Sequence, residues 1–570
     1  MPTATVCTTS LCHMPRRHAI PRRVVPGLLP GLLPGLLPGA VLVAVALGIA
    51  CARTPPAPAP VPAPVPAPVR GRAARAHATI ARAPLPAKNP TLPPVPEVDG
   101  PLAIAVVYPT RNALIASRDS NFIFGSVGNG TAGLTINGDL VPVWPNGAFI
   151  GWEANPPADS QWYDLVAYTL TDTARLRYPA RTLAGIGPRP FVEPEITKLA
   201  TPLVATLRDD SLDRAVSDTD NVIIGRPTPA GDYKWFLFPG TAVRVLEYRD
   251  DMARVQLDDG QDIWVQRRDV KTRDAQRALE TLRATKAVVS ASSGSVDLEL
   301  RVASPPAYVV DETEREITIT LYNTTTSADF EAATDPLVAS VTQSNEPTRT
   351  VYHFTLTRPV YGYQALYEKG VFKISIRRPP VVAVSEPLRG MTIVVDPGHP
   401  PIGATGPTGL WEPVPTLAVG LRVRDLLQAR GAHVVMTRTS AEPVALGDRP
   451  IIARRANANA FISIHLNADP DGQNPFRDNG TGTYYFHPQS QLFARFVQDA
   501  LIPQLGLRNR GVFYQNLAVC RPTWFPAVLA EGLFVIMPDQ ESAIRTPQYQ
   551  EAYARGIVDG LEKFFATFAQ

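Results

Sequence analysis

The sequence predicts a multidomain protein with all-β modules in its N-terminal part and a C-terminal α/β domain. At 570 residues the chain is too long for one hydrophobic core. From about 100 to 385, short segments alternate apolar and polar residues between Gly/Asn/Asp turns, which predicts strands. From Met391 onward, apolar strand segments alternate with helical ones. This alternation predicts a mostly parallel sheet covered by helices on both faces.

A short apolar run near the N-terminus is typical of an export signal. The run AVLVAVALGIA ends just before Cys51 and follows four arginines, Arg16, Arg17, Arg22 and Arg23. It is too short to cross a bilayer as a helix but fits the apolar segment of a signal peptide. We therefore expect residues 1–50 to be a signal peptide and the protein to be exported to the periplasm or cell envelope.

The end of this run, LGIAC, resembles a bacterial lipoprotein signal, in which the cysteine is lipidated and becomes the mature N-terminus. One departure is Gly48, which stands where that signal normally has leucine. We expect a lipid anchor at Cys51, and Ala52 after it favours the outer membrane. The alternative is ordinary secretion with cleavage nearby.

Residues 51–97 are rich in proline and alanine, as in TPPAPAPVPAPVPAPV. Proline at alternating positions favours extended polyproline II and prevents a packed core, so this segment is expected to be a semi-rigid linker. Residues 1–96 hold ten Arg/Lys and no acid, which leaves 45 basic and 52 acidic side chains in 97–570, a net charge of −7. A mildly acidic folded part gives no support to nucleic-acid binding.

The strand-rich middle divides into three expected modules. Turn signals at SVGNG, NGD and PNG separate apolar runs in 98–190, which resembles an immunoglobulin-like β domain. Alternating residues between turns at RDD and DDGQ in 195–275 resemble a bacterial SH3-like domain. A third β set, including VDLELRV, REITITLYN and VFKISIR, occupies 285–385. None of the three shows a cluster of His, Cys and carboxylate residues, and the four scattered cysteines of the chain do not suggest a disulfide framework.

The C-terminal region, 386–570, reads as alternating strands and helices. A helix is expected to begin at Pro415, with Leu417, Leu421 and Leu427 at helical spacing, and to end at Gly431. The expected strands are TIVVD, HVVM, FISIH, TGTYYF and AVLAEGLF, and further helices are expected near 450–458, 490–501 and 547–565.

Potential metal ligands lie where these strands end. His399 follows TIVVDPG, His465 closes FISIH and Glu531 closes AVLAE, while Glu412 lies on the loop from the first strand. Ligands of open α/β sheets bind beyond the carboxyl ends of the strands, and buried imidazoles and carboxylates need partners there.

A divalent cation would be such a partner. His399, Glu412 and His465 suit Zn²⁺, because a catalytic zinc site has three protein ligands and leaves the fourth position to water. A nearby carboxylate can accept the proton of that water as it attacks a carbonyl. The alternative is that these side chains are structural: loop or strand-end histidines bonded to the backbone, and Glu531 an ion-pair partner.

The region 391–567 resembles the zinc-dependent N-acetylmuramoyl-L-alanine amidases, and six motifs appear in the family's order. They are Asp-Pro-Gly-His at 396–399 with Glu412 after it, Thr437-Arg438, Arg449, Ser-Ile-His-x-Asn-Ala at 463–468, Arg-Gly-Val at 510–512 and Pro-Ala-Val-Leu-x-Glu at 526–531. The β set at 285–385 is similar to the domains that bacterial amidases carry ahead of their catalytic region. Three departures occur: Pro400-Pro401 replace Gly-Gly and a following aspartate, the loop to Glu412 is about two residues shorter, and Pro413 replaces a common lysine.

The resemblance implies a hydrolase that cuts the amide bond between N-acetylmuramic acid and L-alanine in peptidoglycan. It implies Zn²⁺ held by His399, Glu412 and His465, with Glu531 as the catalytic glutamate, and peptidoglycan as the partner, together with regulatory envelope proteins. Two alternatives stay open. One is a catalytically decayed wall-binding or regulatory envelope protein, and the other is a metal hydrolase of a different amide or peptide bond.

Overall fold

The computed structural model describes residues 80–157, 159–183, 195–208, 222–272, 279–327 and 329–569. The expected signal peptide at 1–50, Cys51 and residues 51–79 of the expected linker lie outside the described residues. Up to Met391, the described residues form strands, turns and one short 3-10 helix, Arg267–Asp269, but no α-helix.

The first strand-rich region, 98–183, contains two antiparallel sheets around a shared core. The sheet β1-β3-β6 and the sheet β5-β4-β7-β8 contribute apolar side chains such as Ile123, Phe149, Leu134 and Leu165 to that core. The strands are β1 Ala105–Tyr108, β3 Ser120–Ser126, β4 Gly133–Ile136, β5 Asp139–Val141, β6 Ala148–Ala154, β7 Trp162–Tyr168 and β8 Thr173–Pro179, with a parallel pair β2 Leu114–Ile115 and β9 Arg181–Thr182.

The second region, 195–272, is built on one five-stranded antiparallel sheet of order β15-β14-β13-β10-β16. Its strands are β10 Ile196–Leu207, β13 Ala242–Arg249, β14 Met252–Asp258, β15 Gln261–Gln266 and β16 Val270–Thr272, and a separate hairpin pairs β11 Ile223–Gly225 with β12 Trp235–Leu237. The alternation expected from the sequence is present, because Val243, Val245, Val255, Ile263 and Val265 are all fully buried.

The third region, 282–377, contains a five-stranded and a four-stranded sheet, of orders β23-β18-β19-β27-β26 and β20-β21-β25-β24. The first comprises β18 Val288–Ala291, β19 Ser295–Arg301, β23 Glu331–Ala332, β26 Tyr363–Glu368 and β27 Val371–Arg377. The second comprises β20 Ala307–Glu312, β21 Glu316–Tyr322, β24 Val338–Glu346 and β25 Arg349–Leu356, and β17 Leu282–Arg283 pairs with β22 Thr324–Thr325.

The C-terminal region is an α/β domain on a six-stranded sheet of order β29-β28-β30-β33-β31-β32. All neighbouring strands are parallel except β31 and β33, which are antiparallel. The strands are β28 Thr392–Pro397, β29 His433–Met436, β30 Ala460–Asn467, β31 Thr481–Tyr485, β32 Asn509–Tyr514 and β33 Ala527–Phe534. The prediction of a mostly parallel α/β sheet is confirmed.

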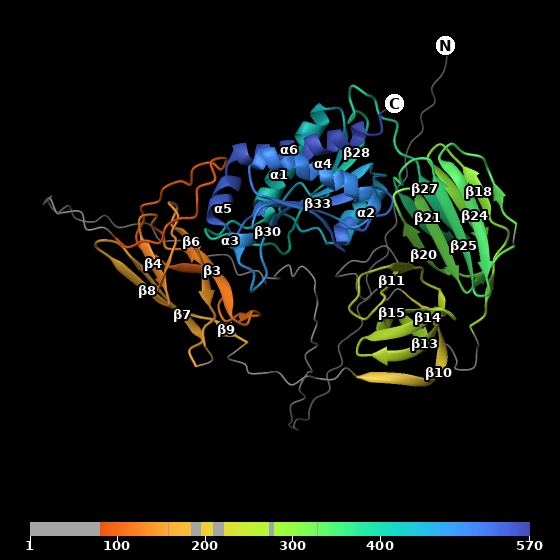
Figure 1. The fold of residues 1–570 in the computed structure, drawn as a ribbon, viewed down its shortest axis with the longest axis horizontal. Coiled ribbons are helices and arrows are strands. Elements are labelled where there is room, and N and C mark those ends of the chain that lie inside the picture. The colour runs from red at the N-terminus through yellow and green to blue at the C-terminus, as the bar shows by residue number, and fades with distance from the viewer. Residues whose placement is uncertain are drawn as a thin grey trace, which may run out of the picture. The chain divides into compact units, whose positions relative to one another are not determined.

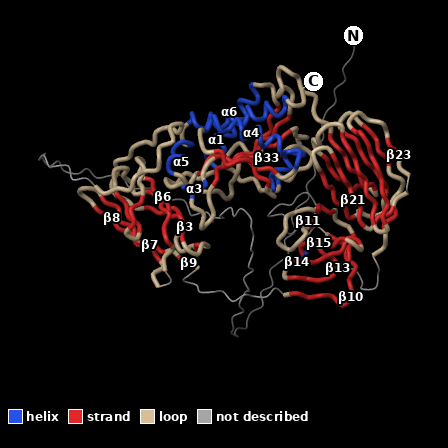
Figure 2. Tube along the Cα trace, viewed as in Figure 1, coloured by secondary structure: helices blue, strands red, loops and turns tan. Residues whose placement is uncertain are grey.

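Helices cover the two faces of this sheet unequally. Three long helices, α1 Pro413–Ala429, α4 Pro488–Leu505 and α6 Pro547–Ala566, pack together on one face (Figures 1 and 2). The opposite face is covered by α2 Asp448–Arg455 and the short 3-10 helix Ala518–Cys520. Two short helices, α3 Pro475–Asp478 and α5 Pro538–Ile544, were not expected, because segments this short show no helical periodicity.

The helix α1 differs in detail from its expectation. It begins at Pro413 rather than Pro415. In the first turn of a helix the backbone N–H has no acceptor within the helix, so proline can stand there without loss of a hydrogen bond. Its buried stripe contains Thr416, Val419, Val423 and Leu427, while Leu417 and Leu421 are only half-buried beside it. The leucine spacing therefore identified the helix but not the residues that face the sheet.

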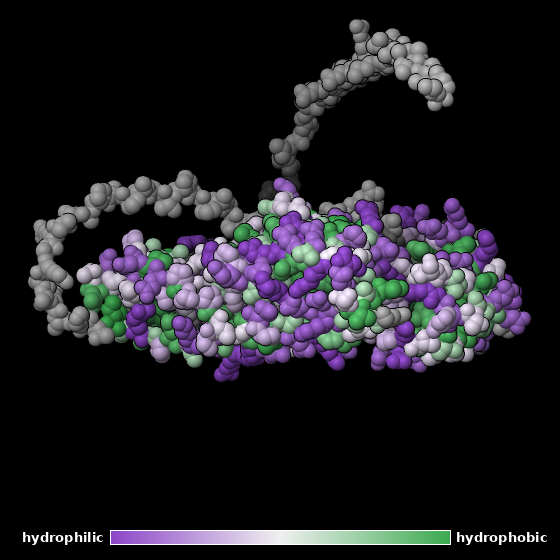
Figure 3. Space-filling view, turned by 90° about the horizontal axis from the view of Figure 1, so that it is seen from above, coloured by the Kyte–Doolittle hydropathy of each residue, from purple (hydrophilic) through white to green (hydrophobic). Residues whose placement is uncertain are grey.

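None of the helices in the described residues is a candidate to cross a membrane. None of them combines the length and apolar character needed to cross a bilayer. Figure 3 shows hydrophilic and hydrophobic side chains interspersed over the face drawn.

Candidate metal and active site

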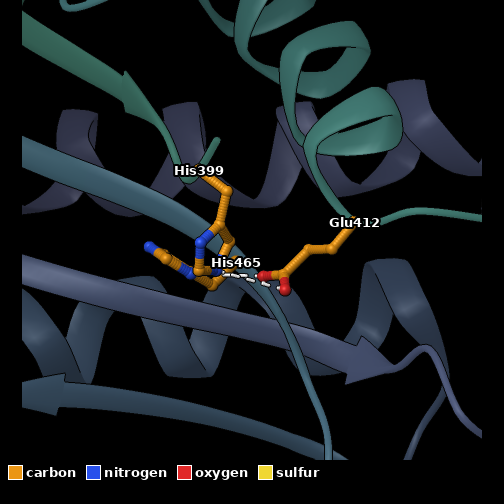
Figure 4. Close-up of side chains that lie close together, drawn as sticks. All are labelled: His399, Glu412 and His465. Atoms are coloured by element: carbon orange, nitrogen blue, oxygen red, sulfur yellow. Dashed lines mark hydrogen bonds and ion pairs between the residues drawn. The ribbon is translucent and has the colours of Figure 1, made fainter. Parts of the chain in front are cut away.

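Three side chains predicted as ligands converge at the carboxyl ends of two neighbouring strands (Figure 4). His399 Nε2 lies 3.2 Å from Glu412 Oε2, and His465 Nδ1 lies 3.2 Å from Glu412 Oε1. One ligand atom from each residue can be chosen so that all three lie within 4.8 Å of one another. The two imidazole rings meet edge to face, with centroids 4.8 Å apart. The structure thus brings together the three residues that the sequence singled out.

The sheet positions the two histidines. Strands β28 and β30 are parallel neighbours, and Pro397 at the end of β28 pairs with Ile464, next to His465. The Gly398 N–H then donates to the Ile464 carbonyl at 2.9 Å, so the chain leaves β28 directly over His465. His399 follows with a positive φ of 59°, which turns the chain sharply at this point.

Glu412 comes from the other end of the loop, immediately before α1. Its carboxylate accepts hydrogen bonds from the backbone N–H groups of Ala404 (2.9 Å) and Leu466 (3.0 Å). Burial alone would raise the pKa of Glu412, but the charge and hydrogen bonds of His399 and His465 lower it below its usual range. The side chain is therefore anionic and oriented by the backbone, as a metal ligand would have to be.

His465 is held in a form suited to metal binding. Burial lowers the pKa of His465, against the opposing hydrogen bond of Glu412. A lowered pKa favours the neutral imidazole, which keeps a lone pair on one ring nitrogen for a cation.

Two buried arginines hold the loop that carries His399. Arg438 donates to the carbonyls of Pro397 (2.8 Å) and Gly398 (2.9 Å). Arg449 donates to the carbonyls of His399 (3.2 Å) and Pro400 (3.1 Å). Both arginines belong to motifs noted in the sequence, and the structure shows what they contact: they fix the backbone around the first histidine.

Asp396 forms a buried ion pair with Arg449. Its carboxylate is fully buried and accepts from Arg449 Nη1 (2.6 Å), Thr437 Oγ1 (2.5 Å) and Ser463 Oγ (2.7 Å). Burial would raise the pKa of Asp396, but Arg449 and the two hydroxyl groups lower it, so it is ionised. A buried charge is tolerated when it is paired and fully hydrogen-bonded, as here.

Glu541 is a residue that sequence reasoning missed. It lies in α5, is fully buried, and accepts hydrogen bonds from the N–H groups of Thr408 (3.0 Å) and Leu410 (3.0 Å) and from Thr408 Oγ1 (2.9 Å). It therefore fixes the middle of the loop between His399 and Glu412. No sequence signal marks it, because an acid in the first turn of a helix is usually solvated.

Glu531 lies on β33 directly opposite His465 in the sheet register. Its Oε2 atom is buried without a hydrogen-bond partner. Burial, and then the nearby charge of Glu412, raise the pKa of Glu531 well above its usual range. A raised pKa makes this carboxylate a stronger base than an exposed glutamate, next to the three converging side chains.

The three side chains fit a zinc ion. Ligand atoms about 2.0–2.2 Å from a tetrahedral zinc lie about 3.3–3.6 Å from one another. The two 3.2 Å separations each involve a different oxygen of Glu412, and one atom from each residue can be chosen with all three within 4.8 Å, so small side-chain movements would complete such a site. Two imidazoles and one carboxylate match the donor set of catalytic zinc sites. The substitution Pro400-Pro401 and the shortened loop have not prevented this convergence.

Comparison with known proteins agrees with this geometry. Residues 393–563 match the Amidase_3 family model, described as N-acetylmuramoyl-L-alanine amidase. The uncharacterized protein YqiI of Bacillus subtilis is 31% identical over 192 residues, which cover 33% of this chain and 90% of that protein. The chain belongs to the Amidase_3 family.

Two further relatives of the Amidase_3 region carry names that refer to an amidase. "Probable cell wall amidase LytH" of Staphylococcus epidermidis is 36% identical over 187 residues, covering 32% of this chain and 61% of that protein. "N-acetylmuramoyl-L-alanine amidase LytC" of Bacillus subtilis is 34% identical over 188 residues, covering 32% of this chain and 37% of that protein. The chain thus spans about three fifths of the length of the LytH relative.

Proposed function

We propose that the protein is a zinc-dependent N-acetylmuramoyl-L-alanine amidase, which hydrolyses the amide bond between N-acetylmuramic acid and L-alanine in peptidoglycan. The observation that supports this most is the convergence of His399, Glu412 and His465 beside a buried, unpartnered carboxyl group of Glu531. Membership of the Amidase_3 family and the printed names of the LytH and LytC relatives support the substrate class.

In this proposal His399, Glu412 and His465 hold the zinc ion. A zinc ion held there supplies Lewis acidity to the scissile carbonyl and to water. The backbone N–H groups of Ala404 and Leu466 orient Glu412 for that task. Outer partners of this kind keep a ligand in place and are important to metal affinity.

Glu531 moves the proton. It accepts the proton that water loses during attack on the amide carbonyl, and it then donates this proton to the nitrogen of the leaving alanine. Glu531 must be ionised to accept this proton, and its raised pKa makes the carboxylate a stronger base than an exposed glutamate. The same raised pKa stabilises the protonated form that donates in the second step. Without that proton the nitrogen would have to leave as an amide anion, which is a very poor leaving group.

The rest of the chain is proposed to bring this site to the wall. In this scheme residues 1–50 direct export, Cys51 carries a lipid in the outer membrane, and 51–97 spaces the protein from that membrane. We propose that 98–190 is an immunoglobulin-like module, 195–275 an SH3-like module and 285–385 a β domain of the kind found ahead of amidase domains. These modules would contact peptidoglycan or regulatory envelope proteins, and 386–570 would be the catalytic domain.

The test is digestion of purified peptidoglycan sacculi by the full chain loaded with zinc, with products analysed by mass spectrometry. The proposal expects free peptide stems that begin with L-alanine, together with intact glycan strands. Glu531→Gln should release no stems while retaining zinc. A wild-type protein that binds sacculi and zinc but releases nothing would favour the wall-binding alternative, and cleavage within the peptide would favour a different bond.

A further inference from the structure

The motif Arg-Gly-Val at 510–512 has no part in the ligand cluster, yet the structure places its arginine near Glu531. In the sheet, Gly482 on β31 pairs with Glu531 on β33 on one side and with Gly511 on β32 on the other. A Cβ at Gly482 would lie 3.8 Å from the Cβ of Arg510. The Phe513 ring would lie nearer still, with its Cε2 atom 3.2 Å from that Cβ. Gly482 thus lies between Glu531 on one neighbouring strand and Arg510 and Phe513 on the other.

Aromatic rings hold the guanidinium of Arg510. Its Cζ atom lies 5.0 Å from the centre of the Phe534 ring and 5.6 Å from that of Phe513. The Nη1 atom is buried and has no hydrogen-bond partner. An arginine fixed by ring contacts but with a buried donor unused is costly unless something else binds that donor.

Two more buried groups at the same place lack partners. Asp469 is 7% exposed, and its Oδ2 atom, like Glu531 Oε2, has no hydrogen-bond partner. The charge of Arg510 acts on both acids: it opposes the rise in the pKa of Asp469, which burial brings to about 6, and the rise in that of Glu531. We call Asp469, Gly482, Arg510 and Glu531 together the β31 cluster.

The strand order shows on which side of the ligand cluster the β31 cluster lies. The ligand cluster lies at β28 and β30, Glu531 at β33, Gly482 at β31 and Arg510 at β32. If the scissile carbonyl lies at the ligand cluster and the leaving nitrogen at Glu531, a peptide that continues in the same direction across the sheet reaches Arg510. Two strand spacings span about 10 Å, which is about three residues of extended peptide.

We propose that Arg510 is a substrate-binding, specificity-determining residue that hydrogen-bonds a carbonyl or carboxylate oxygen within the first three residues of the peptide stem. The inference rests on the proposed amidase function and names the part of the substrate that this face of the site recognises. The guanidinium supplies the donors, among them the buried Nη1 that has no hydrogen-bond partner.

The test is steady-state kinetics of the full chain on a soluble muropeptide, comparing wild type with Arg510→Gln, Arg510→Lys and the control Arg495→Gln, an exposed arginine on α4. For Arg510→Gln we expect KM to rise about 10- to 100-fold with zinc content little changed, because a charged hydrogen bond to substrate is lost. The variant also loses the charge that opposes the rise in the pKa of Glu531, so kcat is compared at the optimal pH of each protein. Arg510→Lys should recover part of the loss, and Arg495→Gln should match wild type.

A pair of muropeptides distinguishes a carboxylate oxygen from a carbonyl oxygen as the partner of Arg510. One muropeptide carries a free carboxylate on the second stem residue, and the other carries its carboxamide. A carboxylate partner predicts that wild type prefers the first substrate and that Arg510→Gln loses this preference. A carbonyl partner predicts no preference in wild type and an equal KM increase on both.

Equilibrium binding of the free stem tripeptide keeps this inference separate from the amidase proposal. If wild type hydrolyses no muropeptide, the amidase proposal fails, but tripeptide binding that weakens in Arg510→Gln would still support the role of Arg510. Gly482→Ala keeps Arg510 but places a Cβ 3.2 Å from the Phe513 ring that contacts the Arg510 guanidinium, so it should also weaken binding. An unchanged KM and unchanged tripeptide affinity in a folded Arg510→Gln protein would overturn the inference.

Discussion

Gly398 lies directly against the imidazole ring of His465. A Cβ atom at position 398 would stand 2.5 Å from both Cε1 and Nε2 of that ring, closer than side-chain atoms approach in proteins. The glycine of the Asp-Pro-Gly-His motif is therefore required by the second histidine, 67 positions further on, and not only by the turn in which it lies.

Gly398→Ala should consequently displace His465 and disrupt the ligand cluster. We expect the variant to fold, because the clash is with one side chain, but to hold far less zinc than wild type and to lose amidase activity. Metal content per chain and circular dichroism measure the two effects. The matched control is Gly294→Ala, where an added Cβ meets no atom within 4 Å. Full zinc binding by Gly398→Ala would show that His465 is not a ligand.

Asp396→Asn should destabilise the protein by about 3–5 kcal/mol, since it leaves the charge of Arg449 buried without its partner. Denaturant unfolding followed by tryptophan fluorescence can measure this change. Asp425→Asn, at an exposed carboxylate on α1, should change stability by less than about 0.5 kcal/mol. Equal stability of the two variants would mean that the Asp396 network contributes little.

Glu541→Ala should loosen the loop between His399 and Glu412 without removing a ligand. The N–H groups of Thr408 and Leu410 lose their acceptor, so hydrogen exchange in 404–412 should accelerate. Because the loop carries Glu412, zinc affinity should fall by about 10- to 100-fold. Asp499→Ala, at an exposed position on α4, is the control and should leave both properties unchanged.

Glu153 should make stability depend on pH. It is 6% exposed on β6, and burial, with a smaller contribution from Asp139, raises its pKa from 4.5 to about 7. The folded state thus binds the proton more tightly than the unfolded state, and stability is lost as pH rises from about 4.5 to 7. The loss is about 3 kcal/mol in order of magnitude.

Glu153→Gln removes this titration. The variant should unfold at a higher temperature than wild type at pH 8 and at a similar temperature at pH 4. Glu442→Gln, at an exposed loop position, should follow wild type at both values. A wild-type Tm that does not decrease between pH 5 and 7 relative to Glu153→Gln would contradict the raised pKa.

The site residues that could be predicted from the sequence are reactive side chains at the ends of apolar strands or on the loop that follows one. His399, His465 and Glu531 could be predicted because imidazole and carboxyl groups at the ends of apolar strands have few structural explanations. Glu412 followed as the sole acid between Asp396 and Asp425 in the sequence. That all three ligands meet depends on β28 and β30 being neighbours, which the strand segments alone do not specify.

Other features could not be predicted, for physical reasons. Glu541 acts through a contact with Thr408, 133 positions away, and nothing local distinguishes it from a solvated acid. The buried stripe of α1 depends on its rotation against the sheet, which three leucines do not fix. Arg510 was recognised only as part of a motif, because Phe534 and Gly482, which lie near it, come from other strands.

The central claim is that His399, Glu412 and His465 hold one zinc ion, and the most direct measurement is zinc per chain in the purified full-length protein by mass spectrometry. The account predicts about one zinc ion in wild type and in Glu531→Gln, and well under one in Glu412→Ala. Wild type with well under one zinc per chain, or Glu412→Ala with as much zinc as wild type, would contradict it.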